Sequence, residues 1–432
     1  MIKNLESIML ESMKNFEGKF DKHPKLIEMY RKNFCLADGK IVVLDDGRVF
    51  IPPSAALPDA QWHRDATASV THFLPLCKSD KQLSEIVKGI SRSQVFYLKI
   101  DPYANSMKRS PDPLVGWKDK YPVCLWVNER KYELDCQCYA LRLPYLYYKN
   151  TGDTSVFTKD FKKALDLVLD LWEREQHHTE LSNYRFEREN CPATDTLCCD
   201  GNGNPVGYTG MIWSAFRPSD DATTYGYHVP SNMFAVAVLG YMAEIAQDIW
   251  KDSDLKGRII TLKTQVEEGI RKYAIVKHQK YGDIFAYEVD GLGNQLLMDD
   301  GFAPNLISAP YFGYCEPGDR IYLNTRRFIL SEDNPMFSKG TLAEGVGSVH
   351  ESIYPKIVHI GVLMRGLTTT DPQELERVFG ILEISDNGSM MMKESFDPSN
   401  PADYTWEDFC WASALFCELI YRYANGILPS SK

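Results

Sequence analysis

The sequence predicts an all-α fold: a closed (α/α)6 barrel of about six helix pairs, with small β-hairpins in its loops. Apolar residues recur at helical spacing through most of the chain, and strand signals are few. Strongly apolar helices alternate with amphipathic ones, as an inner and an outer ring of helices require. We find no interdomain linker, so residues 1–432 are predicted to form one domain, in which residues 1–56 supply N-terminal helices and a hairpin.

Four segments show the helical pattern most clearly. One amphipathic helix places five apolar side chains on a single face: Phe161, Leu165, Val168, Leu169 and Trp172. Residues 233–249 are apolar on most sides, and residues 357–367 and 409–423 are similar. This pattern is typical of buried helices.

A recurrent join connects the predicted helices. An apolar helix ends, a short polar segment with Asp or Thr follows, and an amphipathic helix begins. The join occurs at residues 74–87, 148–161, 248–259 and 365–378. Asp and Thr favour helix N-caps, and Pro372 suits a first turn. These joins therefore predict αα-hairpins.

Strands and long loops fill the remaining segments. Residues 39–53 contain two β-branched runs around Asp-Asp-Gly, which predicts a hairpin, and residues 281–297 predict another. Residues 101–129 and 179–228 are polar and rich in Pro, Gly and Asn. Loops this long are usually functional in a compact domain.

Charge and composition exclude several classes of protein. The net charge of −11 disfavours nucleic acid as a partner. The eleven cysteines lack zinc-site spacing and are expected to be reduced, which predicts a cytoplasmic protein. The N-terminal residues lack a signal-peptide pattern, and no uncharged apolar run of about 18 residues predicts a membrane span. No nucleotide-binding, zinc-protease or serine-hydrolase motif occurs, so we expect neither a cofactor nor a metal.

One stretch, RPSDDATTYGYHVPSN at residues 217–232, places two adjacent carboxylates before a buried helix. Ser231 or Asn232 is better placed to cap that helix, so capping does not explain Asp220 and Asp221. A turn and a reactive site both remain possible. In an extended chain the two side chains would point in opposite directions, so one would reach a site and the other would brace a neighbour.

Three further stretches combine charge with aromatic residues. In QWHRDATASV, Arg64 and Asp65 either favour a helix start or grip hydroxyl groups. In CLWVNERKYELD, Trp126 and Glu129 have the composition of a carbohydrate site, or are a buried Trp and a surface ion pair. In DNGSMMMKESF, Glu394 is either a partly desolvated carboxylate or a solvent-facing one.

Taken together, these stretches resemble glycoside hydrolase family 125, the exo-α-1,6-mannosidases. The resemblance runs from about residue 57 to 423. It is carried by WHRDATASVTHFLPL, IDPYANSM, ERKYELD, GDTSVF, YRFERENCPATDTL, GYTGMIWSAFRPSDDATTYGYHVPSNMFAV, FAYEVDGLGNQLLMDD and KESFDPSNPADYTW.

The resemblance implies an (α/α)6 barrel that removes non-reducing terminal α-1,6-mannose from an oligosaccharide, without a metal and with inversion. Inversion needs two carboxyl groups about 6.5–9.5 Å apart, with space for a water. The family's general acid matches Asp220, and its general base matches Glu394. Asp221 is then expected to help keep Asp220 protonated.

The resemblance also implies sugar-binding residues. Arg64 and Asp65 are expected to hold the terminal sugar, with Glu129 and Asp290 as weaker matches.

The sequence departs from the family pattern near the expected base. Lys393 stands where the family usually has His, Val358 where it has Trp, and Trp406 where it has Arg; His228 replaces an aliphatic residue. These departures leave two alternatives open. One is a mannoside-binding relative that is inactive or altered in specificity, and the other is a different (α/α)6 enzyme, such as an epimerase or a phosphorylase.

Overall fold

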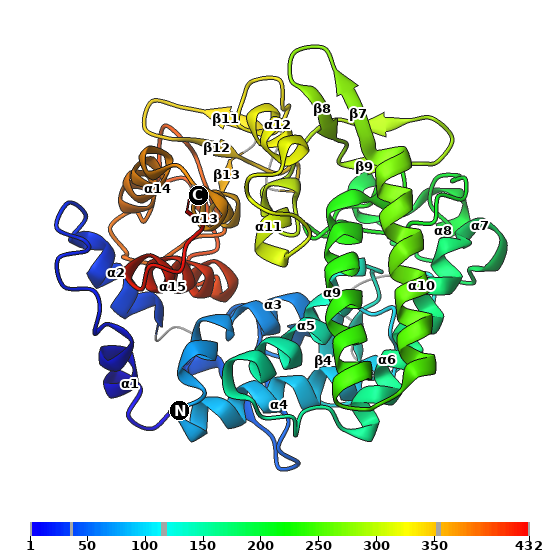
Figure 1. Cartoon of the computed structure of the whole chain (residues 1–432), viewed down its shortest axis with the longest axis horizontal. Coiled ribbons are helices and arrows are strands. Elements are labelled where there is room, and N and C mark those ends of the chain that lie inside the picture. Colours follow the sequence, from blue (N-terminus) through cyan, green and yellow to red (C-terminus); the bar gives the residue numbers. More distant parts are fainter. Residues whose placement is uncertain (1, 35–37, 114–118, 351–355, 431–432) are drawn as a thin grey trace.

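Helices form a closed ring in the computed structural model, which describes residues 2–34, 38–113, 119–350 and 356–430 (Figure 1). Six of the described helices make up the inner ring: α3 (His63–Ala68), α5 (Leu134–Thr151), α9 (Val229–Asp248), α11 (Ala309–Phe312), α13 (His359–Thr368) and α15 (Cys410–Ala424). Each packs against the next, and α15 returns to α3. The predicted (α/α)6 barrel is confirmed.

The outer helices alternate with the inner ones along the chain. They are α4 (Lys81–Leu98), α6 (Lys159–Gln176), α10 (Ser253–Gly269), α12 (Arg320–Ile329), α14 (Pro372–Ile384) and α2 (Lys25–Phe34). The sixth pair joins the two ends of the chain, because α2 packs against α15 (blue and red in Figure 1). Short helices α1 (Leu5–Ser12), α7 (His178–Leu181) and α8 (Cys198–Gly201) lie outside these pairs.

The predicted joins end in capped helices. The side chains of Asp80, Thr158, Asp252 and Asp371 accept hydrogen bonds from the first turns of α4, α6, α10 and α14. The expected cap of α9 is wrong. The helix begins at Val229, and Nδ1 of His228 accepts from the backbone N–H of Ser231.

Short antiparallel strands occupy the loops. Their bounds are β1 (Val42–Val43), β2 (Val49–Phe50), β3 (Ala60–Trp62), β4 (Ser106–Lys108), β5 (Val127–Glu129), β6 (Tyr227–His228), β7 (Ile275–His278), β8 (Gly282–Phe285), β9 (Glu288–Val289), β10 (Gln295–Leu296), β11 (Phe337–Lys339), β12 (Glu344–Val346), β13 (Ile357–Val358), β14 (Ser395–Phe396) and β15 (Tyr404–Thr405). The hairpin expected at residues 39–53 is the β1–β2 pair. The single hairpin expected at residues 281–297 is corrected to two pairs, β7–β8 and β9–β10.

One hydrophobic cluster runs through the ring and includes side chains from Ile2 to Ala424. Helix α9 is the one helix of the described chain that is long and apolar enough to cross a bilayer, and 83% of its apolar window is buried within the protein. A core helix passes the same test of length and composition. The division of the chain into a single domain stays a prediction.

Candidate active site

A cavity opens at the end of the ring where several inner helices begin. Its walls come from the first turns of α3 and α15 and from the loops that precede them, together with loops near residues 219, 302, 350 and 394. The lining residues are Pro53, Ser54, Leu57, Trp62, Arg64, Asp65, Pro218, Ser219, Asp220, Phe302, His350, Glu394, Trp406, Phe409 and Trp411. Carboxyl groups and aromatic rings therefore share one hollow.

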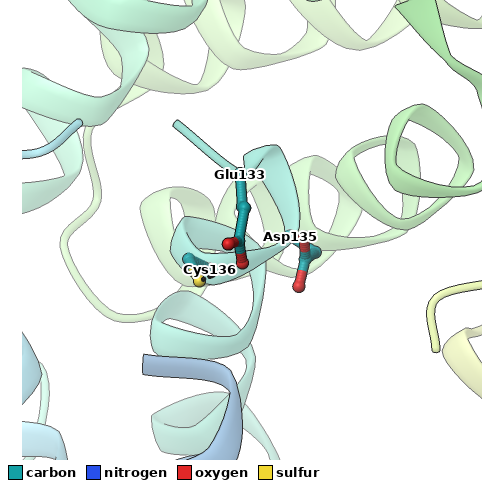
Figure 2. Close-up of side chains that lie close together, drawn as sticks. All are labelled: Glu133, Asp135 and Cys136. Carbon is teal, nitrogen blue, oxygen red and sulfur yellow. Dashed lines mark hydrogen bonds between the residues drawn. The ribbon is translucent and has the colours of Figure 1, made fainter. Parts of the chain in front are cut away.

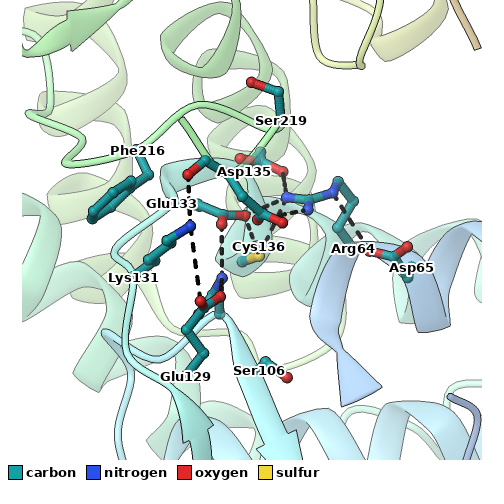
Figure 3. A network of polar contacts seen from close by, with 12 residues as sticks. Arg64, Asp65, Ser106, Glu129, Lys131, Glu133, Asp135, Cys136, Phe216 and Ser219 are labelled. Atoms are coloured by element: carbon teal, nitrogen blue, oxygen red, sulfur yellow. Dashed lines mark hydrogen bonds and ion pairs between the residues drawn. The ribbon is translucent and has the colours of Figure 1, made fainter. Parts of the chain in front are cut away.

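Arg64 is the cation at the centre of a buried acidic cluster (Figure 3). Its guanidinium donates to Glu133 and to Asp135, the latter at 3.2 Å, and lies 3.5 Å from carboxylate oxygens of both Asp65 and Asp220. The side chain is only 4% exposed. A buried arginine with this many charge-assisted contacts has a fixed position, so it also fixes the acids around it.

Glu133, Asp135 and Cys136 lie close together at the start of α5 (Figure 2). Their composition alone would suit a metal ion. The guanidinium of Arg64 already occupies this position, because its Nη1 contacts all three side chains. The three residues are thus partners of Arg64.

Asp65 lies on the cavity wall in the first turn of α3. Burial, together with the charges of Asp220 and Asp135, raises the pKa of Asp65 to about 6, although Arg64 opposes the shift. Asp65 is therefore ionised at neutral pH and can accept hydrogen bonds from sugar hydroxyls.

Asp220 has a left-handed backbone conformation with φ of +68°. Its N–H donates to the carbonyl of Arg217 at 2.9 Å, and its carbonyl accepts from Nζ of Lys131 at 2.8 Å. Burial opposes ionisation of its carboxyl group. The charges of Lys131 and Arg64 and a hydrogen bond with Glu133 outweigh burial and hold the pKa of Asp220 below its usual range.

The pKa of Glu133 shifts in the opposite direction from that of Asp220. Burial, and then the charge of Asp220, raise the pKa of Glu133 well above its usual value, although Arg64 opposes this. Glu133 and Asp220 are thus both partners of Arg64, and their pKa values shift in opposite directions.

Asp221 binds its own neighbours. Its carboxylate accepts from the hydroxyl of Ser219 at 2.9 Å and lies 3.7 Å from Nδ1 of His350. Burial opposes the charge of His350, but its contact with Asp221 and the charges of Asp221, Asp220 and Glu394 raise its pKa to about 10. His350 is therefore an imidazolium at the rim of the cavity at neutral pH.

Glu394 is far from Asp220 in the sequence and lines the same cavity. It directly precedes β14. Its backbone N–H donates to the carbonyls of Thr405 and Trp406, at 3.1 and 3.2 Å, and its carbonyl accepts from the N–H of His359 at 3.0 Å. These bonds tie Glu394 to the sheet of β13, β14 and β15 and to the start of α13.

The structure brings four of the seven expected site residues to the cavity wall: Arg64, Asp65, Asp220 and Glu394. The other three lie outside the set of residues that line the cavity. Glu129 pairs with Arg188 at 2.9 Å, and Asp290 accepts from Leu292 and Asn294 within a turn. A role for Glu129, Asp221 or Asp290 in substrate binding stays a prediction.

The cavity also contains residues that the sequence did not single out, among them Trp62, His350 and Trp411. Trp62 is the first residue of the WHRD motif, so its position in the sequence was a usable signal. Trp126, the aromatic residue that did suggest a sugar site, instead packs against Phe96 in a separate small cluster.

Three of the departures from the family pattern lie in different surroundings. Lys393 is fully buried and turns toward Glu407, with its Nζ at 3.0 Å from that carboxylate. Val358 is also fully buried. Trp406 is 42% exposed, has φ of +39° and lies on the cavity wall.

Carboxyl groups set beside aromatic rings at one end of a helical ring define a sugar-active enzyme of the glycosidase type. Residues 58–421 match the family described as metal-independent alpha-mannosidase (GH125). The chain belongs to this family.

Similar proteins agree with this membership. A solved metal-independent α-mannosidase from Streptococcus pneumoniae, in a non-productive complex with α-1,6-mannobiose, has 38% identity and a TM-score of 0.92, with 98% of this chain and 99% of that chain covered. The meiotically up-regulated gene 157 protein of Schizosaccharomyces pombe is 33% identical over 84% of this chain and 74% of its own length. A Saccharomycopsis fibuligera glucoamylase shares the fold alone, at 10% identity and a TM-score of 0.58 over 98% of this chain and 96% of that chain.

Proposed function

We propose that this chain removes non-reducing terminal α-linked mannose, preferentially α-1,6-linked, with inversion of configuration. Membership of the metal-independent α-mannosidase family supports the substrate class. The observation that carries the mechanism is that Asp220 and Glu394, from distant parts of the sequence, line one cavity with Arg64 and Asp65.

In this mechanism Asp220 is the general acid and Glu394 the general base. Asp220 protonates the departing glycosidic oxygen, while Glu394 removes a proton from the water that attacks the anomeric carbon from the other face. Arg64 and Asp65 hold the hydroxyls of the terminal sugar, since a guanidinium donates and a carboxylate accepts.

The three tryptophans of the cavity differ in exposure, and this difference supports a position for the sugar that leaves. Trp62 and Trp411 are buried, at 7% and 2% exposed, whereas Trp406 is 42% exposed. We therefore assign the enclosed rings to the terminal mannose, and the exposed ring of Trp406 to the apolar face of the sugar that leaves.

Proton NMR of the first product from α-1,6-mannobiose tests the mechanism. Inversion releases β-mannose first, and initial release of α-mannose would contradict it. Phosphate-independent turnover would separate hydrolysis from phosphorolysis. Binding of mannosides in calorimetry without turnover would favour the inactive relative.

Replacement of each proposed catalytic carboxyl tests the assignment. We expect Asp220→Asn and Glu394→Gln each to lower kcat by about 100-fold or more, the usual contribution of a general acid or base. Asp45→Asn and Glu17→Gln change the same side-chain types at exposed positions and are the matched controls. Near-wild-type turnover in Asp220→Asn or Glu394→Gln would reject that residue's role.

We also propose a cytoplasmic location. The support is that every cysteine in the described part of the chain is free, including the exposed neighbours Cys198 and Cys199. Cell fractionation would check it.

A further inference from the structure

A general acid must hold a proton when the substrate is bound, and the surroundings of Asp220 favour its ionised form. Nζ of Lys131 lies against the backbone oxygen of Asp220, and the guanidinium of Arg64 lies 3.5 Å from its carboxylate. The charge of His350 acts in the same direction. A proton held by Asp220 alone would be lost to solvent at neutral pH, so the acid needs a source of protons.

Glu133 is the carboxyl group placed to supply that proton. It is fully buried at the N-cap position of α5, and its side chain makes no capping hydrogen bond to that helix. One oxygen accepts from Nδ2 of Asn105 at 2.7 Å, and the other accepts from Arg64. These two donors fix the orientation of the carboxyl group.

Arg64 lies between the two carboxyl groups, because its Nη1 donates to Glu133 and its Nη2 lies 3.5 Å from a carboxylate oxygen of Asp220. Asp65 and Asp135 contact the same guanidinium, so four carboxyl groups surround one arginine. Carboxylates crowded around a single cation repel one another, and the pair of Glu133 and Asp220 relieves this repulsion by holding one proton. The buried member, Glu133, holds this proton out of reach of solvent.

We propose that Glu133 is a positioning residue that holds the proton which Asp220 delivers to the glycosidic oxygen. This inference rests on the proposed function. Glu133 acts through Asp220, because it lies behind Asp220 and is not one of the residues that line the cavity.

The proton inventory of the reaction balances. The O–H bond of Glu133 breaks as an O–H bond forms on Asp220, whose proton then passes to the glycosidic oxygen as the bond from the anomeric carbon to that oxygen breaks. The water oxygen bonds to the anomeric carbon, and its proton goes to Glu394. The cycle closes when Glu394 loses this proton to solvent and the carboxyl pair regains one.

The leaving group decides whether this proton is needed. A sugar is a poor leaving group unless the glycosidic oxygen is protonated as the bond breaks, whereas dinitrophenolate leaves without a proton. We expect Glu133→Gln to lower kcat/KM for α-1,6-mannobiose by about 100-fold or more, and for dinitrophenyl α-mannoside by less than about tenfold. Asp220→Asn should show the same difference between the two substrates.

Asp135→Asn is the matched control. Asp135 is a second buried acid of α5 that contacts Arg64, at 3.2 Å. Its replacement disturbs Arg64 and should lower the activity on both substrates by the same factor. An equal loss on both substrates in Glu133→Gln, or no loss, would overturn the inference while the proposed function stands.

Two further results complete the test. If Asp220→Asn shows no difference between the substrates, the proposed function fails, and the inference fails with it. If Glu133→Gln does not fold, Glu133→Asp replaces it, because the shorter acid keeps a proton but moves it away from Asp220. That variant should lose more activity on mannobiose than on the dinitrophenyl substrate, and equal losses would reject the proposal.

Discussion

At the scale of single residues, the sequence predicted several of the side chains that line the cavity, but not which of them lie next to one another. The motifs identified Arg64, Asp65, Asp220 and Glu394, which share one cavity. Glu133 stayed hidden within ERKYELD, because nothing in the linear spacing indicates that it meets Asp220. Asp221 was expected to help keep Asp220 protonated, because it is the adjacent negative charge. A separate expectation, that the two side chains point in opposite directions, assumed an extended chain, whereas Asp220 has a left-handed conformation.

Trp406 allows a test of the leaving-group site. We expect Trp406→Ala to lower kcat/KM for α-1,6-mannobiose about tenfold, because an exposed ring that covers a sugar contributes on the order of 1.4 kcal/mol. The inhibition constant of free mannose should stay unchanged, since we assign the terminal sugar to the buried rings.

Trp406→Phe keeps an aromatic face and is the control for this substitution. It should retain most of the activity. A weaker inhibition by mannose in Trp406→Ala would instead assign the ring to the terminal sugar.

The raised pKa of Asp300 predicts that the stability of the folded protein depends on pH. Burial raises the pKa of its carboxyl from 3.8 to about 7 in the folded protein. The folded state therefore binds more protons than the unfolded state between these values, and stability falls as the pH rises from about 4 to 7. Asp300→Asn does not titrate, so its unfolding temperature relative to wild type should be higher at pH 8 than at pH 5. Thermal unfolding of both proteins at both pH values checks this.

Asp290→Asn is the control for this experiment. Burial alone would raise the pKa of Asp290, but hydrogen bonds from Asn294 and Leu292 lower it. This carboxyl is ionised in both states above pH 5, so its replacement should shift the unfolding temperature equally at pH 5 and pH 8. A pH-independent difference for Asp300→Asn would contradict the assignment.

At the scale of elements, local signals predicted most of the helices and their caps. The periodic segments became α6, α9, α13 and α15, and the polar joins became capped turns. The extent of the strands was predicted less well. A hairpin does lie within residues 281–297, as the β9–β10 pair, but strand β8 of the same segment pairs with the preceding strand β7.

Thr158 offers a clean test of a predicted cap. Its hydroxyl accepts from the backbone N–H of Phe161 at 3.1 Å. We expect Thr158→Ala to lower the free energy of unfolding by about 1 kcal/mol, the usual value of a cap, without a change in kcat. Urea denaturation measures this loss. Thr158→Ser keeps the acceptor and should restore most of the stability, and an equal loss in both variants would show that the methyl group matters instead.

At the scale of the whole molecule, the alternation of apolar and amphipathic helices predicted a ring, but not how the ring closes. Helix α2, from the N-terminal segment, packs against α15 near the C-terminus. No local pattern reports a contact between the two ends of a chain. The closure also has a consequence for the site, because α2 contacts the loop that leads to Glu394.

Asn33 makes this contact. Its Nδ2 donates to the carbonyl of Met390 at 2.8 Å, and its Oδ1 accepts from the N–H of Met392 at 3.1 Å. Asn33→Ala leaves the buried N–H of Met392 and the partly buried carbonyl of Met390 without these bonds, which costs about 1–3 kcal/mol of stability. Because a shift of about 1 Å in a catalytic group can lower turnover 100-fold, we expect kcat to fall at least about tenfold. Steady-state kinetics well below the unfolding temperature measure it.

Met29→Ala separates positioning from stability. Met29 is fully buried on the same helix, and its truncation should cost about 2–5 kcal/mol, as much as Asn33→Ala or more. It does not remove the hydrogen bonds to the loop, so kcat should stay near the wild-type value at the same temperature. If the two variants lost activity in proportion to their stability, α2 would only close the ring. A loss confined to Asn33→Ala would show that ring closure also sets the position of the proposed base.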